Sequence, residues 1–196
     1  MKLARMIALV CLSAIAALVL VGPSTAMAES TALCSVEENP CEKENQIKEI
    51  KYKANPLTVL TSLMDYVCDS SFSATVSELG EPQTLNVTEM QYTNCNQGCT
   101  RTVTELGTFK ITRTEAELGE IVGSGFEVFV KCGSTINCTY TFDELKGTIE
   151  GASLTGDNGH ITFKEAEFVN HSGFLCPKVA KLDALFIASK PVYVSS

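Results

Sequence analysis

The sequence predicts an all-β protein, an antiparallel β-sandwich or flattened barrel stapled by disulfides. Three observations favour this fold. Apolar and polar residues alternate at period 2 along most of the chain, turn residues recur between these runs, and no amphipathic helix is recognisable after residue 70. Strands at intervals of about 8–12 residues with turns between them are typical of sandwiches and barrels.

The N-terminal segment predicts export. Lys2 and Arg5 precede an uncharged apolar run over residues 6–22, Pro23 ends that run, and residues 26–28 read Ala-Met-Ala. This order is typical of a signal peptide cleaved after residue 28. An uncleaved membrane anchor is the alternative, although the run is short for a span. We therefore expect a secreted, extracellular or cell-envelope protein with no membrane span in the mature chain.

The charge and the histidine content of the chain argue against two classes of function, nucleic-acid binding and imidazole catalysis. The chain has 196 residues, with 15 Lys and Arg against 23 Asp and Glu, a formal net charge of -8, and two His. Removing residues 1–28 takes away two positive charges, which leaves 13 against 23, or -10. An acidic chain lacks the basic face that nucleic-acid binding needs. Two His leave few candidates for imidazole catalysis.

The cysteines predict a disulfide framework. Loss of Cys11 with the signal peptide turns nine cysteines into eight, and an even count in an exported chain is typical of disulfides. Turn-rich intervals favour three local pairs and leave one long bridge, although eight cysteines allow 105 pairings. The expected pairs are Cys34–Cys41, Cys95–Cys99, Cys132–Cys138 and Cys68–Cys176. Metal or redox chemistry is the alternative, but Cys95 and Cys99 do not form a C-x-x-C motif.

The first elements are a stapled loop and two strands. Residues 29–45 are polar and read as an N-terminal loop, and residues 46–196 as one β-rich domain. Alternation predicts a strand over Glu49–Lys53 and a second strand after Pro56, joined near Ala54-Asn55. The spacing of Ile47 and Ile50 leaves a helix over residues 46–53 as an alternative.

Alternation continues to the C-terminus. A phase change between Val87 and Met90 predicts a β-bulge, and a second phase change falls at Ala166. Leu182–Ser189 is apolar at most positions and predicts a strand buried on both faces, and Pro191 begins a short closing strand. The other expected strands cover residues 103–111, 126–131, 138–142 and 161–163.

No motif predicts a catalytic, cofactor or metal site. His160 follows the turn Asp157-Asn158-Gly159, His171 is expected in the loop before Gly173, and the chain has no G-x-S-x-G motif. The same turn offers oxygen ligands but lacks a complete calcium loop. Acidic pairs occur at Glu37-Glu38, Asp143-Glu144 and Glu165/Glu167, and a chain with 23 acids places some together by chance.

The cysteine-containing segments of the second half carry a resemblance. These are Asn94–Cys99, Cys132 with Cys138-Thr139-Tyr140, Cys176–Ala184 and Pro191–Val194. Together they resemble a group of secreted, cysteine-paired, β-rich bacterial proteins of unassigned function. The resemblance covers about residues 30–196. It implies a bacterial exported domain and supplies no catalytic residue.

These observations predict a non-catalytic secreted domain, structural or binding, whose partner is an unidentified cell-envelope or extracellular component. Two alternatives stay open. One is a secreted hydrolase whose site is assembled from distant residues, with His160 and an acidic residue among them. The other is a small inhibitor or a ligand-carrying barrel, which a filled or empty barrel interior distinguishes.

Overall fold

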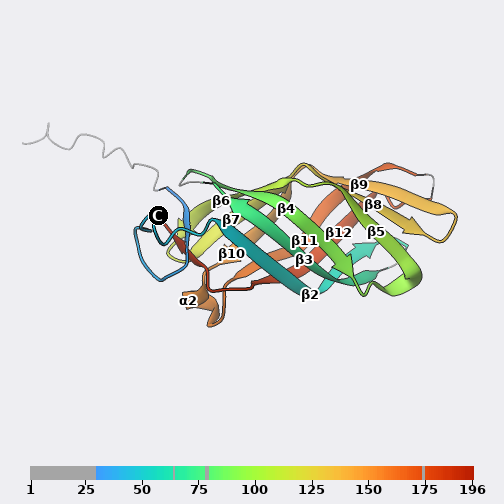
Figure 1. Cartoon of the computed structure of the whole chain (residues 1–196). Helices are drawn as coiled ribbons and strands as arrows, with labels where there is room; N and C mark the ends of the chain where they lie inside the picture. Colours follow the sequence, from blue (N-terminus) through green and yellow to red (C-terminus); the bar gives the residue numbers. More distant parts are fainter. Residues whose placement is uncertain (1–29, 64, 78–79, 174) are drawn as a thin grey trace, which may run out of the picture.

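The structure is a computed structural model that describes residues 30–63, 65–77, 80–173 and 175–196 (Figure 1). The predicted signal peptide, residues 1–28, lies outside the described residues. The elements, in chain order, are β1 (Ala32–Cys34), β2 (Glu49–Thr61), β3 (Tyr66–Val76), β4 (Gln83–Thr93), the 3₁₀ turn η1 (Asn96–Gly98), β5 (Cys99–Glu105), β6 (Thr108–Glu115), β7 (Leu118–Ser124), β8 (Phe126–Cys132), β9 (Ile136–Phe142), β10 (Leu145–Glu150), the short helix α2 (Ala152–Thr155), β11 (His160–Ser172), β12 (Val179–Ala188) and β13 (Tyr193–Ser195).

Eight antiparallel strands close into a barrel. Their order is β10-β7-β6-β4-β3-β2-β12-β11, and the pairing of β10 with β11 completes the ring. β11 is long enough to pair with β10 near its start and with β9 near its end. β9, β8 and β5 therefore continue the sheet away from the ring, and Figure 1 shows them at one end of the elongated molecule, opposite α2. The all-β, disulfide-stapled prediction is confirmed, in its barrel form.

Aromatic rings fill the interior of the ring. Phe72 on β3 has its ring centroid 5.1 Å from that of Tyr52, 5.4 Å from that of Phe109 and 5.3 Å from that of Phe186. All four side chains are essentially buried, and they come from four different strands. Such contacts bury large apolar areas and fix the relative positions of the strands.

β2 differs from its prediction. Asn55 and Pro56 do not end a strand, because Glu49–Thr61 is continuous and its ladders with β3 and β12 both shift register between Ala54 and Leu57. A bulge leaves a residue out of the ladder, so Pro56 is accommodated there in spite of its missing N–H. The helix considered for residues 46–53 is also wrong, since most of that segment is strand.

The two predicted bulges are confirmed, and one burial prediction is wrong. The β3–β4 register shifts between Val87 and Glu89, and the β11–β12 register shifts between Phe163 and Ala166. β12, however, alternates between a buried and an outer face, with Leu185 44% and Ile187 41% exposed. The prediction was wrong because apolar residues also occur on the outer face of β12, so its sequence resembles that of a strand buried on both faces.

Only one predicted disulfide pairing is confirmed. Cys34 pairs with Cys41, but the other three bridges are Cys68–Cys95, Cys99–Cys132 and Cys138–Cys176. The cause is η1, which reverses the chain between β4 and β5. It leaves Cys95 beside β3 and Cys99 opposite Cys132 on β8. The three wrong pairings were Cys95–Cys99, Cys132–Cys138 and Cys68–Cys176.

The two ends of the described chain meet. β1 lies within the segment predicted as an N-terminal loop, and it pairs antiparallel with β13. The Cys34–Cys41 bridge closes the loop that follows β1, and Ser195 donates a hydrogen bond from its hydroxyl to the backbone oxygen of Glu38. This small second sheet is thus fixed to the barrel from both termini.

Candidate functional site

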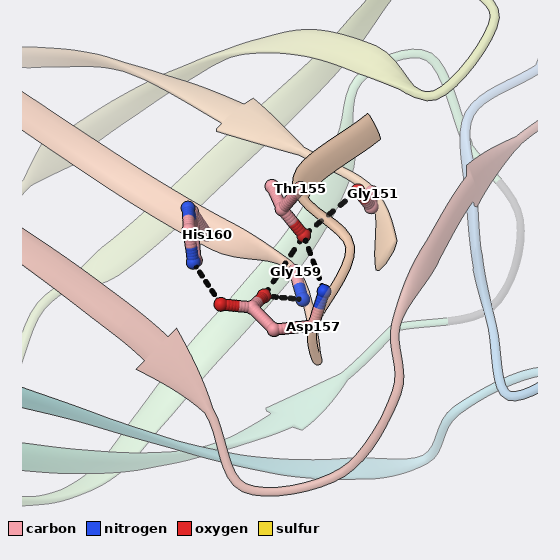
Figure 2. Close-up of polar contacts among 5 residues, drawn as sticks. All are labelled: Gly151, Thr155, Asp157, Gly159 and His160. Atoms are coloured by element: carbon pink, nitrogen blue, oxygen red, sulfur yellow. Dashed lines mark hydrogen bonds and ion pairs between the residues drawn. The ribbon is translucent and has the colours of Figure 1, made fainter. Parts of the chain in front are cut away.

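His160 lies in a polar turn at the start of β11. Its Nε2 is 2.5 Å from Oδ2 of Asp157, and the other carboxylate oxygen of Asp157 accepts hydrogen bonds from the Thr155 hydroxyl, at 2.8 Å, and the Gly159 N–H, at 3.0 Å. Figure 2 shows these contacts gathered around the Asp157 carboxylate. The structure therefore brings His160 and an acid together, as the hydrolase alternative requires.

The Thr155, Asp157 and His160 side chains are arranged as in a turn capped by an aspartate, and not as in a catalytic triad. In nucleophilic catalysis the imidazole stands between the nucleophile and the acid, so that it takes the proton of the nucleophile. Here the Asp157 carboxylate stands between Thr155 and His160, and the Thr155 hydroxyl faces Asp157 and the Gly151 oxygen. The threonine proton therefore has no path to the imidazole.

Electrostatics agree with a structural role for Asp157. Partial burial raises the pKa of its carboxyl, but hydrogen bonds from Thr155, His160 and the Gly159 N–H outweigh this and lower the pKa below its usual value. Both oxygens are occupied by these donors. The calcium reading of this turn therefore gains no support from its geometry.

The remaining sequence candidates do not converge. His171 lies in β11, not in the loop expected before Gly173, and its side chain is outside the description. Each acidic pair has its own local role. Glu38 accepts hydrogen bonds from Glu42 and Asn45 in the N-terminal loop, Glu144 pairs with Lys146, and Glu165 and Glu167 flank Lys181.

One group of potential metal ligands occurs in the described part of the chain, formed by Cys34, Glu38 and Cys41. The two sulfur atoms are joined to each other in a disulfide, so neither offers the thiolate that metal binding needs. The carboxylate of Glu38 orders the loop around them. We therefore assign these three residues to the structure of the disulfide-closed N-terminal loop.

Two hollows of the described residues lie on the outer wall of the barrel. A depression of about 560 Å³ lies over β2 and β3 beside residues 189–192, and one of about 370 Å³ continues it toward β4. Lys51 lines both. We call this surface the outer groove and define it by Lys51, Lys53, Ser71, Ser73, Thr75 and Lys190.

Strand register sets the spacing of the outer groove. Lys51 lies opposite Ser73 and Lys53 opposite Ser71 in the β2–β3 ladder, so ammonium and hydroxyl groups form rows across the two strands. Among the described residues, none of the three lysines has a carboxylate within ion-pair distance. The groove thus offers free cations and hydrogen-bonding groups on a rigid sheet.

Sequence reasoning missed both the outer groove and Arg101. The groove is built from β2 and β3, and β3 was not predicted because serines interrupt its apolar phase. Arg101 lies in the inward phase of β5, between Cys99 and Val103, and a cation at an inward position is the signal that was available.

Comparison of the chain with protein-family models, with curated proteins and with solved structures gave no match. The resemblance to secreted, cysteine-paired bacterial proteins therefore stays a prediction. In the described residues, no helix has the length and apolarity needed to cross a membrane.

Proposed function

We propose that this protein is a non-catalytic, exported binding domain whose ligand lies along the outer groove. One observation carries the proposal: the outer groove has polar and cationic side chains held on two long paired strands, beside apolar residues that include Ile47, Pro191 and Val192. Side chains on paired strands are held in place before a ligand arrives, which reduces the entropic cost of binding.

The side chains of the outer groove suit a hydroxyl-rich, anionic polymer. Serine and threonine hydroxyls donate and accept hydrogen bonds, and the three lysines supply positive charge. Glu49 and Asp69 also line the hollow, so it carries three cations against two carboxylates in a chain that is acidic as a whole. An acidic polysaccharide of the cell envelope or extracellular space has the matching chemistry.

Two further observations support an exported, non-catalytic role. The His160–Asp157 contact belongs to a capped turn in which the threonine hydroxyl does not reach the imidazole. All eight cysteines of the described chain lie in four disulfides, which form and persist in oxidising compartments. We infer export from this pairing together with the N-terminal segment.

Binding of the purified, oxidised protein to immobilised polysaccharides tests the proposal. A panel of neutral and anionic polymers gives the ligand class, and the double variant Lys51→Glu/Lys190→Glu reverses two charges of the groove. We expect the wild type to retain an anionic polymer and the variant to lose at least tenfold in affinity. Added salt should weaken the binding because the contacts are exposed.

Lys110→Glu/Lys131→Glu is the matched control, since both are exposed lysines outside the outer groove, on β6 and β8, and their replacement changes the net charge by the same amount. Equal losses in the control and in Lys51→Glu/Lys190→Glu would show that net charge alone governs binding. Turnover of a glycan, ester or peptide substrate that disappears in His160→Ala would overturn the non-catalytic assignment.

A further inference from the structure

The barrel wall has an unpaired seam between β4 and β5. Residues Gln83–Asn86 of β4 pair with β6, but the rest of β4 pairs only with β3, and β5 pairs only with β8, within the described residues. A hydrogen bond from the Val87 N–H to the Gly107 oxygen marks one end of the seam, and η1 marks the other. We call this seam the β4–β5 gap.

Inward side chains at the β4–β5 gap are reached by solvent. Met90 and Tyr92 on β4 and Arg101 and Val103 on β5 are partly exposed. Inward residues on the strands behind them, such as Leu57, are buried. The gap is therefore a place where solvent approaches the apolar interior of the open end of the sheet.

Two small cavities lie behind the β4–β5 gap. Their volumes are about 30 and 40 Å³, and their shared walls include Tyr92, Phe142 and Phe168. Arg101 lines the larger one, together with Tyr66 and Tyr140. A group the size of a water molecule needs about 10–15 Å³ of cavity volume, so each cavity has room for two to four such groups. The rest of the lining is almost entirely apolar.

Arg101 has no anionic partner among the described residues. Its guanidinium carbon lies 4.8 Å from the ring centroid of Tyr66, and its Nη1 donates a 3.3 Å hydrogen bond to the Cys99 oxygen. Its Nη2 is buried without a hydrogen-bond partner, and no carboxylate in the described chain lies within ion-pair distance. Burial lowers the pKa of Arg101, and Tyr66 and Tyr92 oppose this shift in part.

In the part of the chain that the structure describes, the surroundings of the Arg101 guanidinium lack an anionic group. A half-buried guanidinium normally has a carboxylate or phosphate partner, because desolvating an unpaired charge is costly. Of the acidic residues that the structure describes, none lies at this position. The missing partner would have to supply one anionic group at Nη2 and apolar atoms behind it, since the cavity walls offer few hydrogen bonds.

We propose that the β4–β5 gap admits a short-chain monocarboxylate, whose carboxylate binds the Arg101 guanidinium and whose apolar tail occupies the two cavities. At two to four methylene-sized groups in each cavity, the two cavities limit the tail to about four to eight carbons. A sugar or a polyanion does not fit, because its polar groups would be desolvated against phenylalanine walls. This site is separate from the outer groove, so the proposal of a monocarboxylate site does not depend on the proposal of a polysaccharide site.

Calorimetric titration of the purified, oxidised protein with hexanoate, hexanol and hexylamine tests the charge requirement. We expect hexanoate to bind at least tenfold more tightly than hexanol, and hexylamine not to bind. Arg101→Gln should remove the preference for the carboxylate, whereas Lys131→Gln, which removes a positive charge from the neighbouring strand β8, should keep it. Equal binding of hexanoate and hexanol, or no binding of hexanoate, would overturn the proposal.

A measurement on the wild type keeps the test independent of variant folding. Met90 lines the smaller cavity, and Met64 is the only other methionine after residue 28. In a protein with ¹³C-labelled methionine methyl groups, hexanoate should shift the Met90 signal in a saturable manner. An unchanged Met90 signal at saturating hexanoate would place any binding elsewhere and refute the site.

Discussion

Cys99 lies directly opposite Cys132 in the β5–β8 ladder, and their Cα atoms are 4.2 Å apart. The bridge fastens β5, the terminal strand of the sheet, to its single ladder partner. Because β5 forms one side of the β4–β5 gap, this bridge also sets the position of Arg101.

Removing this bridge should cost more stability than removing the N-terminal one. The Cys99–Cys132 pair is separated by 33 residues and the Cys34–Cys41 pair by 7. On the chain-entropy model the two loops contribute about 3.7 and about 2.4 kcal/mol to the free energy of unfolding. Urea unfolding of the Cys99→Ser/Cys132→Ser and Cys34→Ser/Cys41→Ser variants measures both. A larger loss in the Cys34 variant would contradict the ranking.

The cysteines also show what the sequence can predict. Their even number and export context predict disulfides from composition alone, but partners depend on which strands become neighbours. The alternation that begins at Val103, just after Cys99, predicts a strand without naming β8 as its partner. The Cys34–Cys41 pairing was predictable because a short loop needs no information about the sheet.

Features of the fold were predictable where residues that are adjacent in the sequence determine them. A one-residue phase change shows directly that Val87 and Met90 cannot continue one alternation, so the bulge was predicted correctly. Pro56 was misread because its accommodation depends on register shifts with both neighbouring strands. The outer groove and Arg101 require the positions of several strands, and sequence spacing does not contain them.

Truncating Phe109 should destabilise the barrel strongly. Its ring centroid lies 4.9 Å from that of Phe126, 5.4 Å from that of Phe72 and 5.9 Å from that of Phe163, and the side chain is 2% exposed. Phe109→Ala leaves a cavity among these rings, and we expect a loss of about 3–5 kcal/mol. Leu154→Ala, at a site 57% exposed, should change stability by less than about 0.5 kcal/mol. Similar unfolding midpoints in urea would contradict this account of the core.

The Asp157 turn should lose stability in acid. Its folded-state pKa is lowered, so the unfolded chain binds the proton first. The contribution is present above the unfolded value of about 3.9 and is lost as the pH falls through the folded pKa. Asp157→Asn should therefore be less stable than the wild type at pH 7, by less than about 1 kcal/mol because the group is exposed, with a smaller difference near pH 3.

Asp143→Asn makes the same chemical change in the exposed turn between β9 and β10, and it is the control for Asp157→Asn. Thermal melts of both variants across this pH range give the comparison. A constant difference between Asp157→Asn and the wild type from pH 7 to pH 3 would show that the charge of Asp157 is not what holds the turn. Binding in the outer groove should be unchanged in Asp157→Asn.

Glu117 should behave in the opposite way with pH. It connects the β6–β7 turn to the C-terminal strand, because its Oε2 accepts a 3.1 Å hydrogen bond from the Val194 N–H. Burial raises the pKa of Glu117, the Val194 bond lowers it in part, Glu37 raises it and Arg113 lowers it, with a net increase. The folded state therefore favours the protonated carboxyl. Its stabilising contribution is full below the unfolded pKa of about 4.3 and is lost as the pH rises through the folded pKa.

Two variants of Glu117 separate charge from hydrogen bonding. Glu117→Gln keeps an oxygen acceptor for Val194 and removes the charge, so at pH 7 it should be as stable as the wild type or more so, by less than about 1 kcal/mol. Glu117→Ala leaves the Val194 N–H without this acceptor and should cost about 1–2 kcal/mol. Urea unfolding at pH 7 and pH 4, with Glu115→Gln at an exposed position as control, measures both effects. If Glu117→Gln were less stable than the wild type at pH 7 by an amount that persisted at pH 4, the cost of burying the Glu117 charge would not govern this contact between the barrel and its C-terminal strand.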